Sequence, residues 1–461
     1  MAKERAMMKT YQDWLAVGEN REKQIEFIKQ LIVEHKQSPD YKIAKEAVEY
    51  DKRKNTTITN YRKWIVDALG KYSPDMTSAN YKLPSGFFPR FVTQFNQYLL
   101  GNGVTLKEEQ NKAMLGKDFD SKLQKLGHSA LVQGVSYGYW NADRLEIFSF
   151  LEFAPLKDED TGAIRGGARF WQLDPDRPTH ITFYLEDGYM KFIDDKTVTR
   201  IVQEKTAYVQ TYHVEGSGAI VGVEGMNYGA FPIIPLYANP HHQSELVGIR
   251  EAIDCYDLIK SGFANDVDEA TMVYWIITNA GGMDAKDVAD FIRQLKERHG
   301  ASVDGDSDVS VTPHTTEAPY QARQAYLEQL KNDLYEDFQI VNVTALASGN
   351  KTATEIRAAY EPMNNKADQY EYCVLDFLNS LFALIGLKDE PSFTRSMIVN
   401  QLEETQMVLS AAQYLDDEFV IKKLKWISPE EADELIKRKD SENLSRFSEI
   451  ATASEVGEET E

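Results

Sequence analysis

One short run in the sequence brings metal-binding side chains close together. His241 and His242 precede Glu245, and imidazoles and carboxylates are common metal ligands. However, side chains next to each other in the chain do not converge on one helix face, and no second His or Cys cluster accompanies them. We therefore expect no metal site and interpret this run as the solvated start of the following helix.

A second stretch, Ser348–Thr352 (SGNKT), is similar to part of a phosphate-binding loop. That motif needs a glycine directly before Lys-Ser/Thr and another glycine five positions earlier. Here Asn350 precedes Lys351, and Ala345 occupies the earlier position. The stretch also lies between two expected helices rather than after a buried strand. We expect no nucleotide site here.

Other catalytic patterns are missing from the sequence. The glycines of residues 216–225 (GSGAIVGVEG) are not followed by a helical pattern, so a dinucleotide-binding loop lacks its context. Nucleophile elbows, H-E-x-x-H pairs and recognisable pairs of catalytic carboxylates are also absent. The sequence therefore predicts no enzyme, no catalytic residue and no cofactor.

These polar stretches lie in a helix-rich span, Phe231–Leu387. Its prolines at 232, 235 and 240 favour extended backbone, after which Ser244 is a plausible N-cap. Apolar residues then recur at steps of three and four, as on one face of a helix. The later elements expected in this span are a strand-like run at 271–279, a helix at 284–298, short strands at 303 and 309–311, a helix at 319–338 and a helix at 352–387 containing Pro362.

The rest of the chain predicts helices followed by strands. Residues 1–75 are charged and helical, and Tyr41–Lys54 has so little apolar content that we interpret it as a mobile helix or arm. Helices are expected at Arg90–Leu100, stopped by Gly101, and at Phe119–Gln133. Alternating apolar strands from about 135 to 214 then predict an antiparallel sheet, and so an α+β fold. After 390 the expected helices are Pro391–Leu409, Asp416–Lys425 and one capped by Ser428, before a disordered end.

The composition limits the classes of partner. The 461 residues carry a net charge of −22, whereas a protein that grips nucleic acid through its phosphates should be basic. The acidity would either keep a passing duplex sliding by repulsion or serve solubility alone. Cys255 and Cys373 are the only cysteines and are expected as buried free thiols. The N-terminus has no apolar core, and no apolar window is long enough for a membrane span, so we expect a soluble intracellular protein.

The order helix, small mixed module, returning helix, polar loop and long helix resembles the portal proteins of long-tailed bacteriophages. The stretches that carry the resemblance are FPIIPLYANP, SELVGIREAIDCYDLIKSGFANDVDEA, YLEQLKNDLYEDFQIVNV and SGNKTATEIRAAYEPMNNKADQYE. The resemblance covers about residues 55–440. It implies an N-terminal helical arm at 1–54, a wing at 55–243, a stem helix at 244–268, a clip at 269–318, a second stem helix at 319–343, a tunnel loop at 344–351, a long kinked helix at 352–390, a helical crown at 391–440 and an acidic, partly disordered tail at 441–461.

The resemblance also implies a function. A dodecameric ring at one capsid vertex would pass double-stranded DNA during packaging and ejection, and would bind terminase, a head-completion adaptor, and capsid and scaffolding proteins. The protein would lie in the virion, and in the host cytoplasm during assembly, with no membrane partner. The expected DNA-contacting tunnel loop contains Ser348, Gly349, Asn350 and Lys351, and the expected partner-binding clip contains Tyr274, Trp275, Asp304 and Asp306.

Two alternatives remain open at this point. The two stem-like helices could simply form a core. However, each also carries a polar face, which a ring would turn towards a channel. On the first helix this face comprises Glu245, Arg250, Asp254, Asp257 and Lys260. The chain as a whole could be a non-portal α+β scaffold or an enzyme of unknown activity. The native mass separates a ring from a monomer or dimer.

Overall fold

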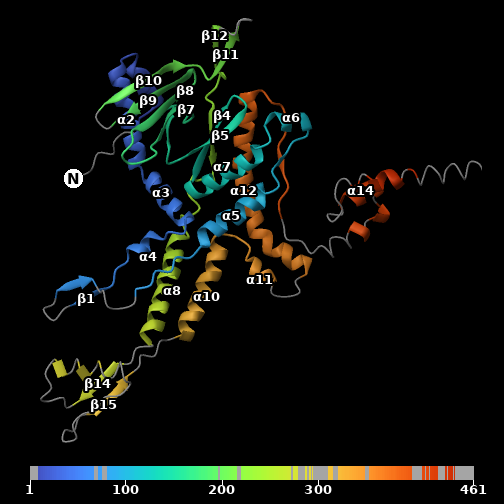
Figure 1. Cartoon of the computed structure of the whole chain (residues 1–461). Helices are drawn as coiled ribbons and strands as arrows, with labels where there is room; N and C mark the ends of the chain where they lie inside the picture. Colours follow the sequence, from blue (N-terminus) through green and yellow to red (C-terminus); the bar gives the residue numbers. More distant parts are fainter. Residues whose placement is uncertain are drawn as a thin grey trace, which may run out of the picture. The chain divides into compact units, whose positions relative to one another are not determined.

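The computed structural model in Figure 1 describes most of the chain. The described residues are 9–66, 71–74, 80–195, 198–214, 220–270, 274–278, 310–314, 320–347 and 352–396, with short pieces between 286 and 293 and between 408 and 441. The chain divides into two compact units. One comprises Met1–Ile340 with Met363–Ser396, and the other comprises Val341–Pro362 with Met397–Glu461.

The larger unit begins with three helices, of which the first two pack against a five-stranded antiparallel sheet and the third packs against later helices. The helices are α1 (Tyr11–Val17), α2 (Arg21–Gln37) and α3 (Pro39–Asp51). The sheet has the order β10-β9-β8-β7-β6, and its strands are β6 (Phe153–Lys157), β7 (Ile164–Trp171), β8 (Thr179–Leu185), β9 (Gly188–Asp194) and β10 (Thr199–Thr206). Phe27, Ile28, Leu31 and Ile32 recur at helical spacing and bury the inner face of α2 in the core of this sheet.

A second sheet, in the order β13-β4-β5, supports the helices that follow. Its strands are β4 (Val135–Asn141), β5 (Arg144–Ser149) and β13 (Ile233–Tyr237), and β11 (Val209–Val214) pairs separately with β12 (Ile220–Met226). Helix α7 (Phe119–Gln133) packs against β4 and β5, and α5 (Phe87–Leu100) packs against α7. Gly138 of β4 has no side chain where Phe377 packs, since a Cβ there would lie 2.6 Å from the phenylalanine ring.

Two antiparallel helices extend from this body, as Figure 1 shows. They are α8 (Arg250–Ala270) and α10 (Tyr320–Asp337), and between them in the chain β14 (Tyr274–Thr278) pairs with β15 (Ser310–His314). Helix α12 (Ala353–Ile385) contains Pro362 and belongs to the larger unit from Met363 onwards. Smaller elements are α4 (Thr56–Asn60), β1 (Trp64–Val66), β2 (Tyr72–Pro74), β3 (Val104–Thr105), α6 (Glu109–Met114) and β16 (Ser392–Phe393).

The second unit is described in short helical pieces. It contains α11 (Val343–Ala347), the first part of α12, a 3-10 turn at Ala412–Tyr414 and α14 (Asp417–Lys423). Helix α14 confirms most of the helix expected at Asp416–Lys425. The predicted cap at Ser428 lies outside the described residues.

The α+β fold with antiparallel sheets is confirmed, and so are several individual helices. Helix α7 has the predicted bounds, and α10 and α12 begin within one residue of expectation. The amphipathic spacing of these segments is a local property, which explains why the sequence predicted them.

Four local predictions are wrong. Helix α8 begins at Arg250, not after Ser244. Helix α5 ends at Leu100 before Gly101, as predicted, but it begins at Phe87 rather than at Arg90. Residues 392–393 form β16, which pairs with β3, so no helix begins at Pro391. Tyr41–Lys54 is no mobile arm, because α3 buries Ala44, Ala47 and Tyr50.

Candidate functional site

Helices α8 and α10 are attached to the rest of the larger unit at one end, and side-chain contacts hold them to each other at the other end. Near the body, Phe91 of α5 lies between two aromatic residues of the α10 segment, with ring centroids 4.9 Å from Tyr335 and 5.1 Å from Phe338. At the far end, Phe263 of α8 meets Tyr320 edge to face at 5.6 Å, and Asp266 pairs with Arg323. The buried residues of α10 (Leu330, Leu334 and Tyr335) thus gather at the body end, while contacts at both ends hold the two helices together.

A polar ladder runs along another face of α8. Asp257, Ser261 and Asn265 stand four residues apart and are all buried. Each accepts a hydrogen bond from a backbone N–H of the segment Tyr81–Ser85: Tyr81 to Asn265 Oδ1 at 2.7 Å, Leu83 to Ser261 Oγ at 3.0 Å and Ser85 to Asp257 Oδ1 at 2.9 Å.

The spacing explains why this ladder fits. Four residues of a helix advance about 6.0 Å, and two residues of extended chain advance about 6.6 Å. Every second N–H of an antiparallel extended segment can therefore meet every fourth residue of the helix. We call residues 81–85 the strap. The strap binds α8 directly before α5 begins at Phe87.

Asn55 joins the N-terminal helices to the same face of α8. Its Nδ2 donates to Asp257 Oδ2 and to Asp254 Oδ1, both at 2.9 Å, and Tyr50 also donates to Asp254. Burial raises the pKa of Asp257, while the hydrogen bonds from Asn55 and Ser85 oppose this shift. Burial and the bond to Asp254 also raise the pKa of Tyr50. The contact between the N-terminal helices and α8 is therefore a largely buried network in which Asn55, Tyr50, Asp254 and Asp257 are joined by hydrogen bonds.

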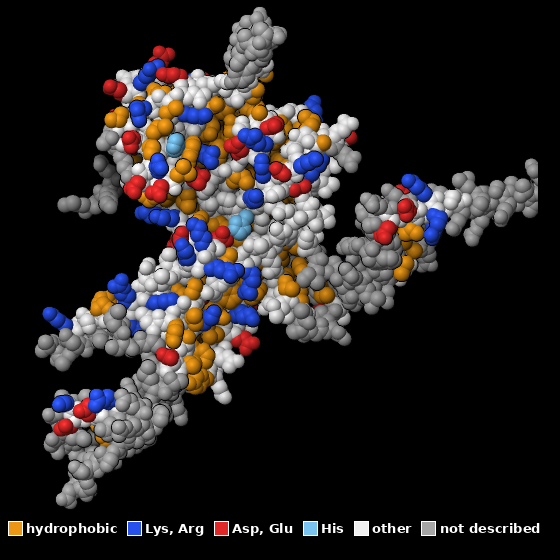
Figure 2. All heavy atoms as spheres, in the orientation of Figure 1, with side chains coloured by type: hydrophobic (Ala, Val, Ile, Leu, Met, Phe, Trp, Pro, Cys, Tyr) orange, Lys and Arg blue, Asp and Glu red, His pale blue; other side chains and the backbone are white. Residues whose placement is uncertain are grey.

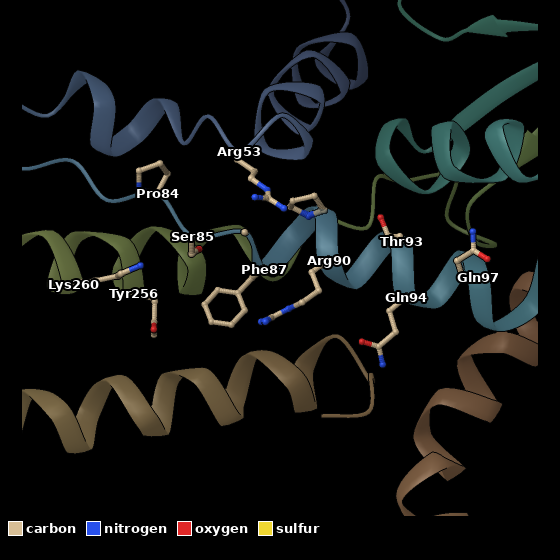
Figure 3. Close-up of a pocket in the computed structure, with 12 residues that line it drawn as sticks. Arg53, Pro84, Ser85, Phe87, Arg90, Thr93, Gln94, Gln97, Tyr256 and Lys260 are labelled. Atoms are coloured by element: carbon tan, nitrogen blue, oxygen red, sulfur yellow. The ribbon is translucent and has the colours of Figure 1, made fainter. Parts of the chain in front are cut away.

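A basic pocket of about 660 Å³ opens where α5 meets α8 (Figure 3). Arg53, Arg90 and Lys260 line it, and none of the described lining residues is acidic. Gly86, at the start of α5, gives the helix no side-chain cap, so the positive end of the helix dipole adds to these charges. Figure 2 shows Lys and Arg side chains gathered over this region. The arrangement suits an anionic group such as a carboxylate or a phosphate.

The residues considered for metal binding have other contacts. Glu245 pairs with Lys366 at 2.5 Å, and the His242 ring stacks on Tyr237 at 3.6 Å. Among the residues that the structure describes, no three His, Cys, Asp or Glu side chains gather as a metal site. Over the same part of the chain, no helix is both long and apolar enough to cross a membrane.

The structure brings few of the predicted site residues together. Tyr274 and Trp275 lie in β14, where they pair with His314 and Pro313 of β15. The other predicted clip residues and the whole predicted tunnel loop lie outside the described residues: Asp304, Asp306, Ser348, Gly349, Asn350 and Lys351. Cys255 and Cys373 are free thiols, but they are half-buried rather than buried.

The expected polar face of the first stem helix is wrong in two places. Glu245 precedes α8 and is engaged in an ion pair with only 11% of its side chain exposed, and Asp257 is fully buried in the ladder. Ser244 does not cap α8, because it lies six residues before the helix begins; its Oγ donates to the carbonyl of Val132 at 2.6 Å and accepts from the Leu246 N–H at 3.1 Å within a turn. Sequence reasoning also missed Asn55, Ser261 and Asn265. The four-residue spacing of Asp257, Ser261 and Asn265, which places them on one helix face, was the available signal.

Comparisons with known proteins agree on one family. The family model described as "Phage portal protein, SPP1 Gp6-like" matches residues 40–444. The portal protein of Clostridium phage phiCD119 is 24% identical over 220 residues, or 45% of this chain and 48% of that protein. The portal protein of Bacillus phage SPP1 is 24% identical over 363 residues, or 75% of this chain and 69% of that protein.

A solved structure is also similar. One chain of "Neck of native GTA particle computed with C12 symmetry" is 12% identical, with a TM-score of 0.40, over 74% of this chain and 89% of that one. The chain spans about half of the Clostridium phage protein that it matches. Because the family match extends over most of the sequence, this protein belongs to the SPP1 Gp6-like family of phage portal proteins.

Proposed function

We propose that this protein forms a closed ring at one vertex of a phage capsid and that double-stranded DNA passes through its channel during packaging and ejection. The family match over residues 40–444 carries this proposal. A single asymmetric subunit makes such a ring through head-to-tail contacts that close on themselves. The proposed ring contains twelve copies, lies in the virion and assembles in the host cytoplasm.

The α8–α10 pair supports this assignment. The two helices lead to the antiparallel pair of β14 and β15, in the order expected for two stem helices and a clip. We propose that the clip, with Tyr274, Trp275, Asp304 and Asp306, binds neighbouring copies, the terminase and the head-completion adaptor. Among the described residues β14 pairs only with β15, and an uncovered strand edge can take a further strand from another chain.

The proposed DNA contact is the loop of Ser348, Gly349, Asn350 and Lys351. One lysine from each subunit would form a weakly positive collar in an acidic tunnel, and such single contacts exchange readily because salt screens them. The variant Lys351→Glu should still form rings and should package less DNA. Normal packaging by this variant would exclude the loop as a DNA contact.

The ring itself is tested by the mass of the purified full chain. We expect a species of about twelve times 52.5 kDa, with a central channel in electron micrographs. A monomer or dimer under all assembly conditions would contradict the proposal and favour a non-portal scaffold or an enzyme. Deleting residues 280–315 should leave the larger unit folded and abolish packaging, and persistent packaging would exclude the clip assignment.

A further inference from the structure

We call the described residues 61–66, 71–74 and 80–83 the arm. Strands β1 and β2 pair within it, with Trp64 opposite Pro74 and Val66 opposite Tyr72. Lys82 closes the base of the arm, because its Nζ donates to the carbonyl of Tyr61 and lies 5.0 Å from the centre of that ring. The described residues of the arm therefore contain a defined antiparallel strand pair.

The arm carries large aromatic side chains that are exposed in the single chain. The exposed fractions are 49% for Tyr61, 58% for Trp64, 75% for Tyr72 and 50% for Tyr81. An isolated two-stranded hairpin is only marginally stable in water, and clustered exposed apolar groups are typical of binding surfaces. Figure 2 shows hydrophobic and basic side chains together over β1. The arm thus needs a partner to bury its aromatic surface.

Both ends of the arm are held by the polar network on α8. The strap fixes its C-terminal end through Asp257, Ser261 and Asn265. Asn55 fixes the other end, because its Oδ1 caps α4 through the N–H of Ile58 while its Nδ2 bonds to α8. An arm held at both ends loses less conformational freedom on binding than a free loop, so more of its contact energy becomes affinity.

The charge of the arm favours an acidic partner. Residues 61–83 contain four basic side chains and two acidic ones, in a chain whose net charge is −22. The rest of every copy therefore carries a net negative charge and offers acidic side chains of complementary charge. Duplex DNA is also acidic, but its stacked bases offer no surface that could bury four aromatic side chains.

From these observations we propose that the arm binds a neighbouring copy of this chain and so links adjacent subunits. The aromatic side chains of β1 and β2 lie against the neighbour, and the basic side chains beside them face its acidic surface. This inference rests on the proposed ring. It adds to that proposal a specific contact, with an anchored base on one subunit and an aromatic end on the next.

Photo-crosslinking in the full chain tests this contact. A photoreactive phenylalanine analogue replaces Trp64 or Tyr72, and a control carries it at Leu173, which is 86% exposed. We expect cross-linked dimers from positions 64 and 72 in the ring fraction, and none from the monomer fraction or from position 173. Cross-links in assembled rings that form only within one chain, or only to DNA, would overturn the proposal.

A variant gives an independent measurement. Trp64→Ser combined with Tyr72→Ser removes the two most exposed aromatic side chains of the arm, so the thermal midpoint of the monomer should stay unchanged. The concentration needed for ring formation should rise at least about tenfold. If the wild type forms no ring, the proposed function fails; if it forms rings and the double variant assembles equally well, only the arm contact fails.

Discussion

The ion pair between Lys366 and Glu245 should stabilise the larger unit strongly. It joins α12 to the segment before α8, with Nζ and Oε2 2.5 Å apart and only 15% and 11% of the two side chains exposed. The same Nζ donates to the carbonyl of Phe338 at 3.0 Å and lies 3.5 Å from the centre of its ring. Water therefore screens this charge very little.

We predict that Lys366→Met lowers the free energy of unfolding by about 3–5 kcal/mol, the usual cost of removing one partner of a buried pair. Methionine keeps much of the aliphatic contact with Phe338, so the loss is mainly electrostatic. Glu245 would retain one hydrogen bond, from Asn239 Nδ2 at 2.9 Å. Adding Glu245→Gln removes the unpaired charge and should restore more than half of the lost stability.

Urea titrations of the monomer measure these differences. The exposed pair Lys107–Glu390 provides the control, because its atoms are also 2.5 Å apart but its side chains are 67% and 80% exposed. Lys107→Met should leave the urea midpoint unchanged. Equal effects of the two Lys→Met variants, or a loss below about 1 kcal/mol for Lys366→Met, would refute the argument that burial makes this pair strong.

Three further predictions test other parts of the larger unit. Burial lowers the pKa of His35 from 6.5 to about 4, so between these pH values the unfolded chain binds a proton that the folded chain does not. The free energy of unfolding should therefore fall as the pH drops from 6.5 towards 4. In urea titrations the wild type should lose about 2 kcal/mol more than His35→Gln between pH 7 and pH 5. Equal losses would exclude His35 as the cause. Gly127→Ala should lower the free energy of unfolding by about 1–3 kcal/mol, because the new Cβ would lie 2.5 Å from Tyr370 Oη. The control Gly262→Ala in α8 meets no atom within 4 Å and should raise it by up to about 1 kcal/mol. Thermal unfolding that shifts in the same direction for both variants would contradict this reasoning. Asp257→Ala leaves the Ser85 N–H without its acceptor and removes one of the two acceptors of the Asn55 amide. The change should cost about 2–3 kcal/mol and speed amide hydrogen exchange in the strap; unchanged exchange there would show that Asp257 does not hold the strap.

The sequence predicted those elements whose signals are local. Helix α7 follows from apolar residues at helical spacing between Phe119 and Gln133, and the strands follow from alternation between turns. The family that the comparisons then showed was already suggested by the order of four elements: α8, the β14–β15 strand pair, α10 and α12. These features depend on neighbours along the chain, which a single sequence displays directly.

Tertiary structure decided which polar residues are buried and what they bind. Asp257 was expected on a solvent-facing surface, yet it is fully buried because the strap, about 170 residues earlier in the chain, supplies its hydrogen-bond donor. Glu245 was considered as a metal ligand, yet it pairs with Lys366 from α12. A buried carboxylate needs a partner, but that partner can come from any part of the chain. Spacing along the sequence shows where a helix face lies, and only the folded chain determines which segment covers it.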